Sequence, residues 1–331
     1  MKRNIALLLM VIASSLVAVQ PVLAKEQNIK DVSQKIEKLS QGLVGRIGVA
    51  AQEIGGDQVI AVNGDETFAM ASTYKVAIAT KVMDLVDKGE LSLDQMVDVP
   101  QNIYVAGEVA IAERFPYPGV QFSVANLIYA MITESDNTAT DVCLGLVGGP
   151  AAVTKNLRRL GIKDFRVDRP VSGILMDFYG VPAVTPEAIV EAISNNPALV
   201  AAQANPNPKF EADPRDHTTP NAYLKLLLAI DNGTAMSDES RKFLQGVMSR
   251  TRTGAGRLKG LLPKGTPVAH KTGTLGGVAN DAGYITLPDG RRFAIAVFTN
   301  SSNTPSADRD RAIAEISRTL YDFYYLTALD K

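Results

Sequence analysis

The fold is decided by residues 267–300, which read PVAHKTGTLGGVANDAGYITLPDGRRFAIAVFTN. Apolar and polar side chains alternate over 267–274, 278–287 and 291–300, which is typical of β-strands with one buried face. Short glycine-containing turns separate the three runs. Because such turns join neighbouring strands of opposite direction, we expect an antiparallel meander.

The beginning of the chain contributes further strands to this sheet. Residues 43–54 have a β-like pattern, and 58–62 follow as a hairpin partner. Helical spacing at 29–41 and 307–326 predicts covering helices, and the middle of the chain is mostly helical. The predicted fold class is therefore α/β of the α+β kind: an antiparallel sheet built from both chain ends with flanking helices, plus an inserted all-helical lobe, with the functional site between them.

The first 24 residues have the features of a secretory signal peptide. Lys2 and Arg3 precede an apolar run over 5–19, and small residues at 22–24 offer a cleavage site. An uncleaved membrane anchor is the alternative, but the apolar run is short for a span. We predict a secreted or periplasmic protein that leaves the membrane after cleavage. The expected parts are a signal peptide (1–24) and a single domain (25–331), with a sheet lobe (25–68 and 235–331) and a helical lobe (69–234).

Charge and cysteine content exclude several kinds of partner. Without residues 1–24, 32 basic and 35 acidic side chains remain, a net charge of −3. This balance argues against nucleic acid or an anionic membrane as a partner. Cys143 is the only cysteine, so no intramolecular disulfide can form, and its apolar surroundings favour a core residue. A monomer is expected.

The stretch 71–75 places a hydroxyl and an amine three residues apart, at Ser72 and Lys75. On a helix these two positions share a face, so the amine could take the proton of the hydroxyl. The alternative is an N-terminal cap with an exposed lysine. The motif predicts a nucleophile only if further groups of the chain join it.

Two further motifs supply such groups. Ser135-Asp136-Asn137 lies in a break between two predicted helices, where a hydroxyl and a carboxamide can face a cleft, although a plain helix cap is the alternative. Lys271-Thr272-Gly273-Thr274 lies on the first late strand. Its glycine allows a ligand to approach the backbone, and Lys271 and Gly273 face the same way.

With these three motifs in this order, the chain resembles the class A β-lactamase family of penicillin-recognising serine enzymes. The resemblance covers essentially the whole chain after residue 24 and includes the segment 215–220, which is similar to the family's segment closing the active-site loop. It implies an exported serine β-lactamase that hydrolyses the β-lactam amide through an acyl-enzyme. No cofactor is implied.

The resemblance also implies a role for each motif residue. Ser72 is the acylated nucleophile, Lys75 takes or shuttles its proton, and Ser135 relays a proton to the leaving ring nitrogen. Asn137 holds the side-chain amide of the substrate. The backbone N–H groups of Ser72 and Thr274 form the oxyanion hole. The substrate carboxylate is attracted by the residues of the late strand, namely Lys271, Thr272, Gly273 and Thr274.

An arginine is expected to help bind that carboxylate. Counting from the lysine motif, Arg257 falls where one subgroup of the family keeps its arginine, while Asn280 occupies the strand position that other members use. A surface charge beside Lys259 is the alternative interpretation of Arg257.

The base for deacylation is where the chain departs from the family. The family glutamate stands two residues after an arginine and is followed by a Leu-Asn pair, whereas here 166–170 read RVDRP. Asp168 is the first candidate and Asp177 the second. The loop also offers Glu187, Glu191 and Glu211 as rival bases, although the first two are more simply explained as helix charges near an N-terminus. A shorter aspartate could miss the water by about 1 Å. Arg166 and Asp216 resemble the family's bracing ion pair, so the loop 166–216 is much longer than usual, with short helices expected after Thr185 and Asn196 and a stiff linker over 205–208.

Other enzyme classes fit less well. His217 and His270 are the only histidines, and neither accompanies a nucleophile elbow, which argues against a Ser-His-Asp hydrolase. No Cys/His/Asp cluster has metal-ligand spacing, and the glycines near 254–256 lack the context of a nucleotide loop. Two alternatives to the β-lactamase stay open. One is a D-alanyl-D-alanine peptidase or penicillin-binding protein that deacylates slowly and acts on peptidoglycan stem peptides, and the other is a non-catalytic β-lactam sensor or cell-wall binding module.

Overall fold

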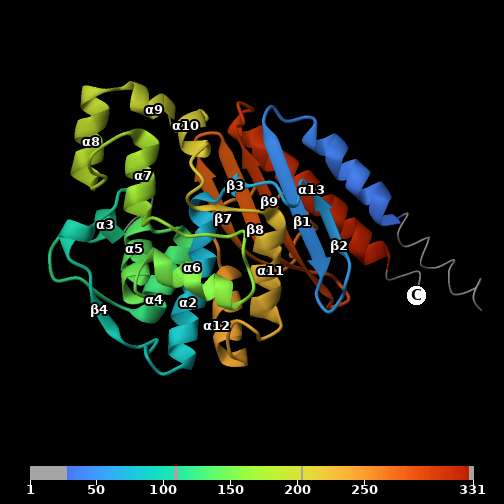
Figure 1. Cartoon of the computed structure of the whole chain (residues 1–331), viewed down its shortest axis with the longest axis horizontal. Helices are drawn as coiled ribbons and strands as arrows, with labels where there is room; N and C mark the ends of the chain where they lie inside the picture. The colour runs from blue at the N-terminus through green and yellow to red at the C-terminus, as the bar shows by residue number, and fades with distance from the viewer. Residues whose placement is uncertain (1–27, 108–110, 203, 328–331) are drawn as a thin grey trace, which may run out of the picture.

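A five-stranded antiparallel sheet forms the centre of the computed structural model, which describes residues 28–107, 111–202 and 204–327 (Figure 1). The strand order is β2-β1-β9-β8-β7. The strands are β1 (Arg46–Glu53), β2 (Val59–Val62), β7 (Val268–Leu275), β8 (Val278–Thr286) and β9 (Arg292–Asn300). The predicted fold class and the meander over 267–300 are confirmed, while the predicted signal peptide lies outside the described residues.

The early hairpin joins the late meander through β1 and β9, which pair from Arg46↔Asn300 to Glu53↔Phe293. The register places Val49 opposite Val297, so alternate side chains of both strands enter the same core. On one face these side chains pack beneath a helix over 28–40 and α13 (Ser306–Leu326), which contribute Ile36 and Ile313, both fully buried. Burial of each such side chain is worth about 1.5–3 kcal/mol. β9 is the central strand, and β7 lies at one edge of the sheet.

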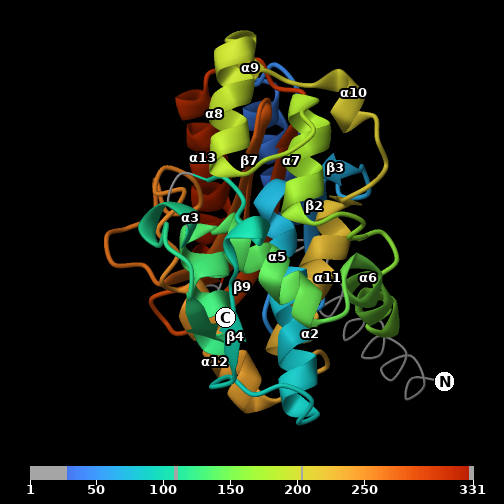
Figure 2. The same cartoon turned by 90° about the vertical axis from the view of Figure 1, so that its left-hand side faces the viewer.

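The other face of the sheet carries the helical lobe (Figures 1 and 2). Helix α11 (Pro220–Asp231) lies against β1 and β9, and its Tyr223 stacks on Phe165 at 5.5 Å between ring centroids. The other elements of this lobe are η1 (Ala71–Tyr74), α2 (Lys75–Asp87), α4 (Val124–Tyr129), η3 (Ala130–Glu134), α5 (Asn137–Leu146), α6 (Pro150–Arg159) and α12 (Asp238–Met248).

Most of the expected helices form, with two changes of detail. The Ser123 side chain caps α4 by accepting the N–H of Asn126. The helix then changes to a π-helical turn, η3, which ends at Ser135. Four short elements fall in regions for which the sequence predicted no strand: β3 (Phe68–Ala69) pairs with β6 (His217–Thr218), and β4 (Met96–Asp98) with β5 (Gln121–Ser123). The remaining short elements of the region before β5 are η2 (Gln101–Ile103) and α3 (Ile111–Arg114).

The long loop is a small helical unit that crosses the top of the molecule in Figure 1. It contains α7 (Val171–Tyr179), α8 (Pro186–Asn195), α9 (Ala198–Ala202) and α10 (Pro208–Glu211). The helices after Thr185 and Asn196 are confirmed, whereas α7 was not expected and Pro208 begins a helix rather than ending a linker. Phe178 and Phe210 pack edge to face at 5.3 Å and give the unit a core of its own.

Candidate active site

Ser72 lies on η1, the 3-10 turn that leads directly into α2. The segment that leads into the turn is held by β8, because the Asn280 side-chain amide donates to the carbonyls of Ala69 and Met70 at 2.9 and 3.0 Å. Ala71 adopts a left-handed conformation, with φ of +46°. Such strain persists only where the surroundings enforce it, and the half-buried Ser72 directly follows the strained residue.

Lys75 is the first residue of α2 and is fully buried. Its Nζ donates to the Ser135 carbonyl at 2.7 Å, to Asn137 Oδ1 at 2.9 Å and to Ser135 Oγ at 3.3 Å. Burial lowers the pKa of Lys75 to about 7, and the charges of Asp136 and Asp141 oppose this shift. An amine with such a pKa is available as a base at neutral pH.

The Ser135-Asp136-Asn137 motif turns at the end of the π-helical turn. Ser135 is left-handed, with φ of +60°. Asp136 is buried and caps α5, because its carboxylate accepts the N–H groups of Ala139 and Ile111, both at 2.6 Å. This turn leaves the Ser135 hydroxyl within reach of both lysines, since Lys271 Nζ also donates to it at 3.0 Å.

The edge strand β7 closes the other side of the site. A Cβ atom at Gly273 would lie 2.5 Å from the Met70 carbonyl oxygen and 3.1 Å from the Ser72 nitrogen, so only glycine allows this strand to approach η1. Lys271 is fully buried, and its pKa is lowered well below the ordinary value by burial and by the Lys75 charge. Thr272 is buried beside it, whereas Thr274 is exposed at the mouth.

Arg257 reaches the same strand from the segment after α12. Its guanidinium donates to Thr274 Oγ1 at 2.8 Å and to the Gly273 carbonyl at 3.0 Å. Asp310 of α13 holds the other edge, with 2.7 Å between Nε and Oδ1. Although Arg257 is only 5% exposed, it therefore places a positive charge beside the exposed Thr274 hydroxyl.

The arginine that braces the long loop is Arg169 and not Arg166. Arg169 Nε lies 2.6 Å from Asp216 Oδ2, and both side chains are buried. Arg166 is instead half exposed and forms its ion pair with Asp168. The expected Arg166–Asp216 pair is thus wrong, because two arginines three positions apart compete for one aspartate and only the second one points inward.

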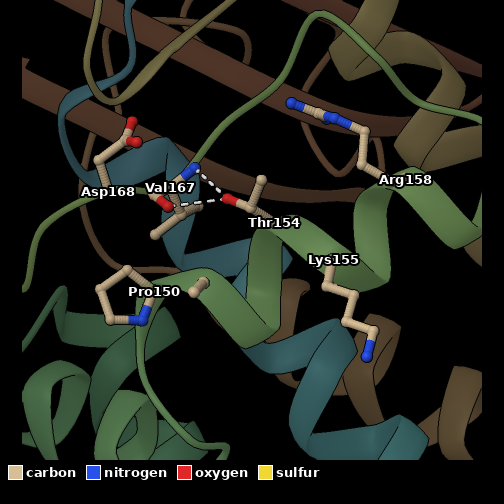
Figure 3. Close-up of a pocket in the computed structure, with 7 residues that line it drawn as sticks. Pro150, Thr154, Lys155, Arg158, Val167 and Asp168 are labelled. Atoms are coloured by element: carbon tan, nitrogen blue, oxygen red, sulfur yellow. Dashed lines mark hydrogen bonds between the residues drawn. The ribbon is translucent and has the colours of Figure 1, made fainter.

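Asp168 is held on the outer side of the loop. Its carboxylate accepts from Arg166 Nη2 at 2.6 Å and Nε at 2.8 Å, and from the Asp216 N–H at 2.9 Å. Figure 3 shows it beside Val167 on the rim of a surface pocket of about 500 Å³ formed with α6. Asp177 is also engaged in ion pairs, with Arg169 and Arg215.

Counting two residues from the bracing Arg169 gives Val171, which begins α7 and is 5% exposed. No carboxylate is therefore presented from the position where the family resemblance implies the glutamate. The nearby carboxylate that the sequence did not single out is Asp141, which accepts the N–H groups of Val171 at 2.6 Å and Ser172 at 3.0 Å. Its spacing of four from Asn137 on a predicted helix was the available signal, since such residues share a face.

The assembled groups suit acyl transfer to a serine. Lys75 and Lys271 both donate to the Ser135 hydroxyl, Ser72 lies three residues before Lys75, and Arg257 supplies positive charge for an anionic substrate. Among the residues described, no group of three His, Cys, Asp or Glu side chains could hold a metal ion. Within the same ranges, no helix combines the length and apolar character that crossing a bilayer requires.

Comparison with known proteins agrees with this chemistry. The model of the β-lactamase enzyme family matches residues 31–324. The extended-spectrum β-lactamase PER-1 of Pseudomonas aeruginosa is 32% identical over 300 residues, covering 88% of this chain and 87% of the relative. A β-lactamase of Bacteroides uniformis is 30% identical over 311 residues, covering 90% and 93%.

Solved structures give the same result. An ancestral class A β-lactamase is similar with a TM-score of 0.73 and 32% identity, covering 88% of this chain and 99% of that one. The crystal structure of the TLA-3 extended-spectrum β-lactamase gives a TM-score of 0.74 at 29% identity, covering 89% and 99%. Since the family model spans most of the chain and the sheet, helices and serine motif agree with it, the chain belongs to the β-lactamase enzyme family and is a class A serine β-lactamase.

Proposed function

We propose that Ser72 is the nucleophile of this β-lactamase and that Lys75 is the base that activates it. In acylation, Ser72 Oγ adds to the β-lactam carbonyl, its proton passes to Lys75 Nζ, and the ring C–N bond breaks. Ser135, which lies between both lysines, gives its hydroxyl proton to the ring nitrogen and takes the proton held by Lys75 Nζ in its place, so Lys75 is neutral again. The observation that carries the proposal is the fully buried Lys75, whose amine has a pKa of about 7.

The binding roles follow from the walls of the site. Lys271 and Arg257, with the hydroxyls of Thr272 and Thr274, attract the substrate carboxylate. Asn137 holds the side-chain amide. The backbone N–H groups of Ser72 and Thr274 form the oxyanion hole, where each donor is worth about 3–4 kcal/mol. The close approach of Gly273 to η1 supports this pairing.

The other expectations join the proposal. We infer that the chain is exported, with residues 1–24 as a cleaved signal peptide, that it acts as a monomer away from the membrane, and that residues 25–331 form one catalytic domain. The pattern of charged, apolar and small residues over 2–24 supports export.

Timed intact-mass measurements after mixing with a penicillin test the chemistry. We expect an adduct of one penicillin mass that forms and decays, turnover of a chromogenic cephalosporin, and neither in Ser72→Ala. Unchanged turnover in Ser72→Ala would refute the nucleophile. An adduct that persists would favour slow deacylation, as in a penicillin-binding peptidase, and the absence of a carboxylate at Val171 is the observation that keeps this second candidate.

A further inference from the structure

The second half-reaction needs a base, and in the described part of the long loop each acid near the bracing Arg169 is already paired. Val171 stands in place of an acid at the loop position that follows Arg169. Asp168 is bound by Arg166 and the Asp216 N–H, and Asp177 by two arginines. The base of hydrolysis is therefore expected on another element.

The buried amine of Lys75 is placed for this task by its surroundings. All its hydrogen-bond acceptors are neutral: two backbone carbonyls, a hydroxyl and a carboxamide oxygen. A lysine that is fully buried without a directly bound carboxylate gains little from being charged. It can lose its proton near neutral pH and accept one from a water molecule.

Asp141 is the carboxylate that links this amine to the loop. It lies on α5 one turn after Asn137, the residue that accepts from Lys75. Its two oxygens are fixed by the first two N–H groups of α7, at 2.6 and 3.0 Å. The carboxylate thus lies against the backbone of Val171, which is the position that lacks the acid.

The remaining charges around the amine have other partners. Asp136, which caps α5, accepts the N–H groups of Ala139 and Ile111 with its carboxylate. Lys271 faces Lys75 from β7 and is tied to Ser135 and the Thr272 carbonyl. The Tyr74 hydroxyl lies within the field of Asp141, and burial raises its pKa well above the ordinary value, so it stays neutral. The charge of Asp136 acts on Lys75 more strongly than that of Asp141, but among the described residues Asp141 is the one of the two whose carboxylate also holds the loop.

We propose that Lys75 is the base for both half-reactions in this enzyme and that Asp141 is the positioning residue that holds the loop to α5 and, together with Asp136, favours the protonated form of Lys75. In deacylation, water adds to the ester carbonyl and its proton passes to Lys75 Nζ. The ester C–O bond then breaks, and Lys75 returns the proton to Ser72 Oγ. The cycle consumes one water and leaves both residues unchanged. This inference rests on the acyl-enzyme proposed above.

The test separates the two steps in the full-length mature protein. Acylation is followed as kcat/KM for a chromogenic cephalosporin, and deacylation as decay of the penicillin adduct by intact mass after excess drug is removed. Both rates should fall on the acid side with one common apparent pKa. Asp141→Asn should move the acid side of both pH–rate profiles to lower pH by about 0.5–1 unit, because one of the two carboxylate charges that favour protonated Lys75 is gone while Asp136 remains. Asp141→Glu should keep the wild-type profile.

Two further variants distinguish an electrostatic role from a structural one. Asp213→Asn also removes a loop carboxylate, one that forms ion pairs with Arg169 and Arg215. It should nevertheless leave the pH–rate profiles of acylation and deacylation unchanged. Asp168→Asn should leave deacylation within about threefold of wild type, whereas a catalytic base contributes about 10²–10⁴-fold.

Three results would overturn the inference. They are unchanged pH–rate profiles in a folded Asp141→Asn protein, an equal shift of these profiles in Asp213→Asn, and a hundredfold slower deacylation in Asp168→Asn. If Asp141→Asn does not fold, two other variants still test the inference. A shifted pH–rate profile in Asp141→Glu would refute it, and so would slow deacylation in Asp168→Asn. Failure of the underlying acyl-enzyme would be seen separately, as the absence of any adduct in the wild type.

Discussion

Replacing Gly273 by alanine should damage catalysis much more than stability. The added Cβ would lie 2.5 Å from the Met70 carbonyl oxygen and 3.1 Å from the Ser72 nitrogen. Ordinary carbon–oxygen contacts need about 3.4 Å, so β7 must retreat from η1 by about 1 Å. That retreat separates the N–H groups of Ser72 and Thr274, and a displacement of this size costs about 100-fold in rate. Overpacking should cost about 1–3 kcal/mol in the free energy of unfolding.

The assay is kcat for a chromogenic cephalosporin together with urea unfolding. Gly246→Ala is the matched control, because Gly246 lies inside α12 and a Cβ added there would meet only open space. In a helix interior this change should stabilise by about 0.5–1 kcal/mol and leave kcat unchanged. If Gly273→Ala retained kcat within threefold of wild type while folded, the two N–H groups would not form the oxyanion hole through this contact.

Three further outcomes can be measured. Arg169→Ala should lower the free energy of unfolding in urea by about 3–5 kcal/mol, because it leaves Asp216 buried without its partner. Arg166→Ala should cost below about 1 kcal/mol, because its ion pair with Asp168 is half exposed. Equal losses in the two variants would contradict the Arg169–Asp216 bracing pair. Arg257→Ala should raise KM for several β-lactams by about tenfold or more, and an unchanged KM would remove Arg257 from substrate binding. In the wild type, kcat/KM should fall below about pH 7, because protonated Lys75 cannot accept the Ser72 proton; a flat profile from about pH 5.5 to 8.5 would exclude Lys75 as the base.

The sheet could be predicted because its signals are local. Alternation over 267–300 fixes which side chains enter the core, and two short turns fix the direction of the strands. The Ser72–Lys75 spacing was informative for the same reason. The short pairs β3–β6 and β4–β5 could not be found in this way, since each has two or three residues and forms only when distant segments meet.

The loop was harder because its outcome depends on competition between neighbours. Arg166 and Arg169 are both plausible partners for Asp216, and the sequence does not say which side chain is directed inward. Helix α7 had a signal in Val171, Ile174 and Phe178, which share its buried face. Pro170 is a further signal, because proline is common immediately before or at the first turn of a helix.

The same helix explains why the loop carries no acid at position 171. Once α7 begins at Val171, that side chain enters the core with Ile174 and Phe178, where an ionised glutamate would be costly to bury. The free N–H groups at the start of α7 need an acceptor with negative charge, and Asp141 supplies it from α5. In this chain the carboxylate beside position 171 therefore belongs to α5 and not to the loop, and its charge acts on Lys75. An enlarged, ordered loop and a lysine-based deacylation are on this view two consequences of one structural change.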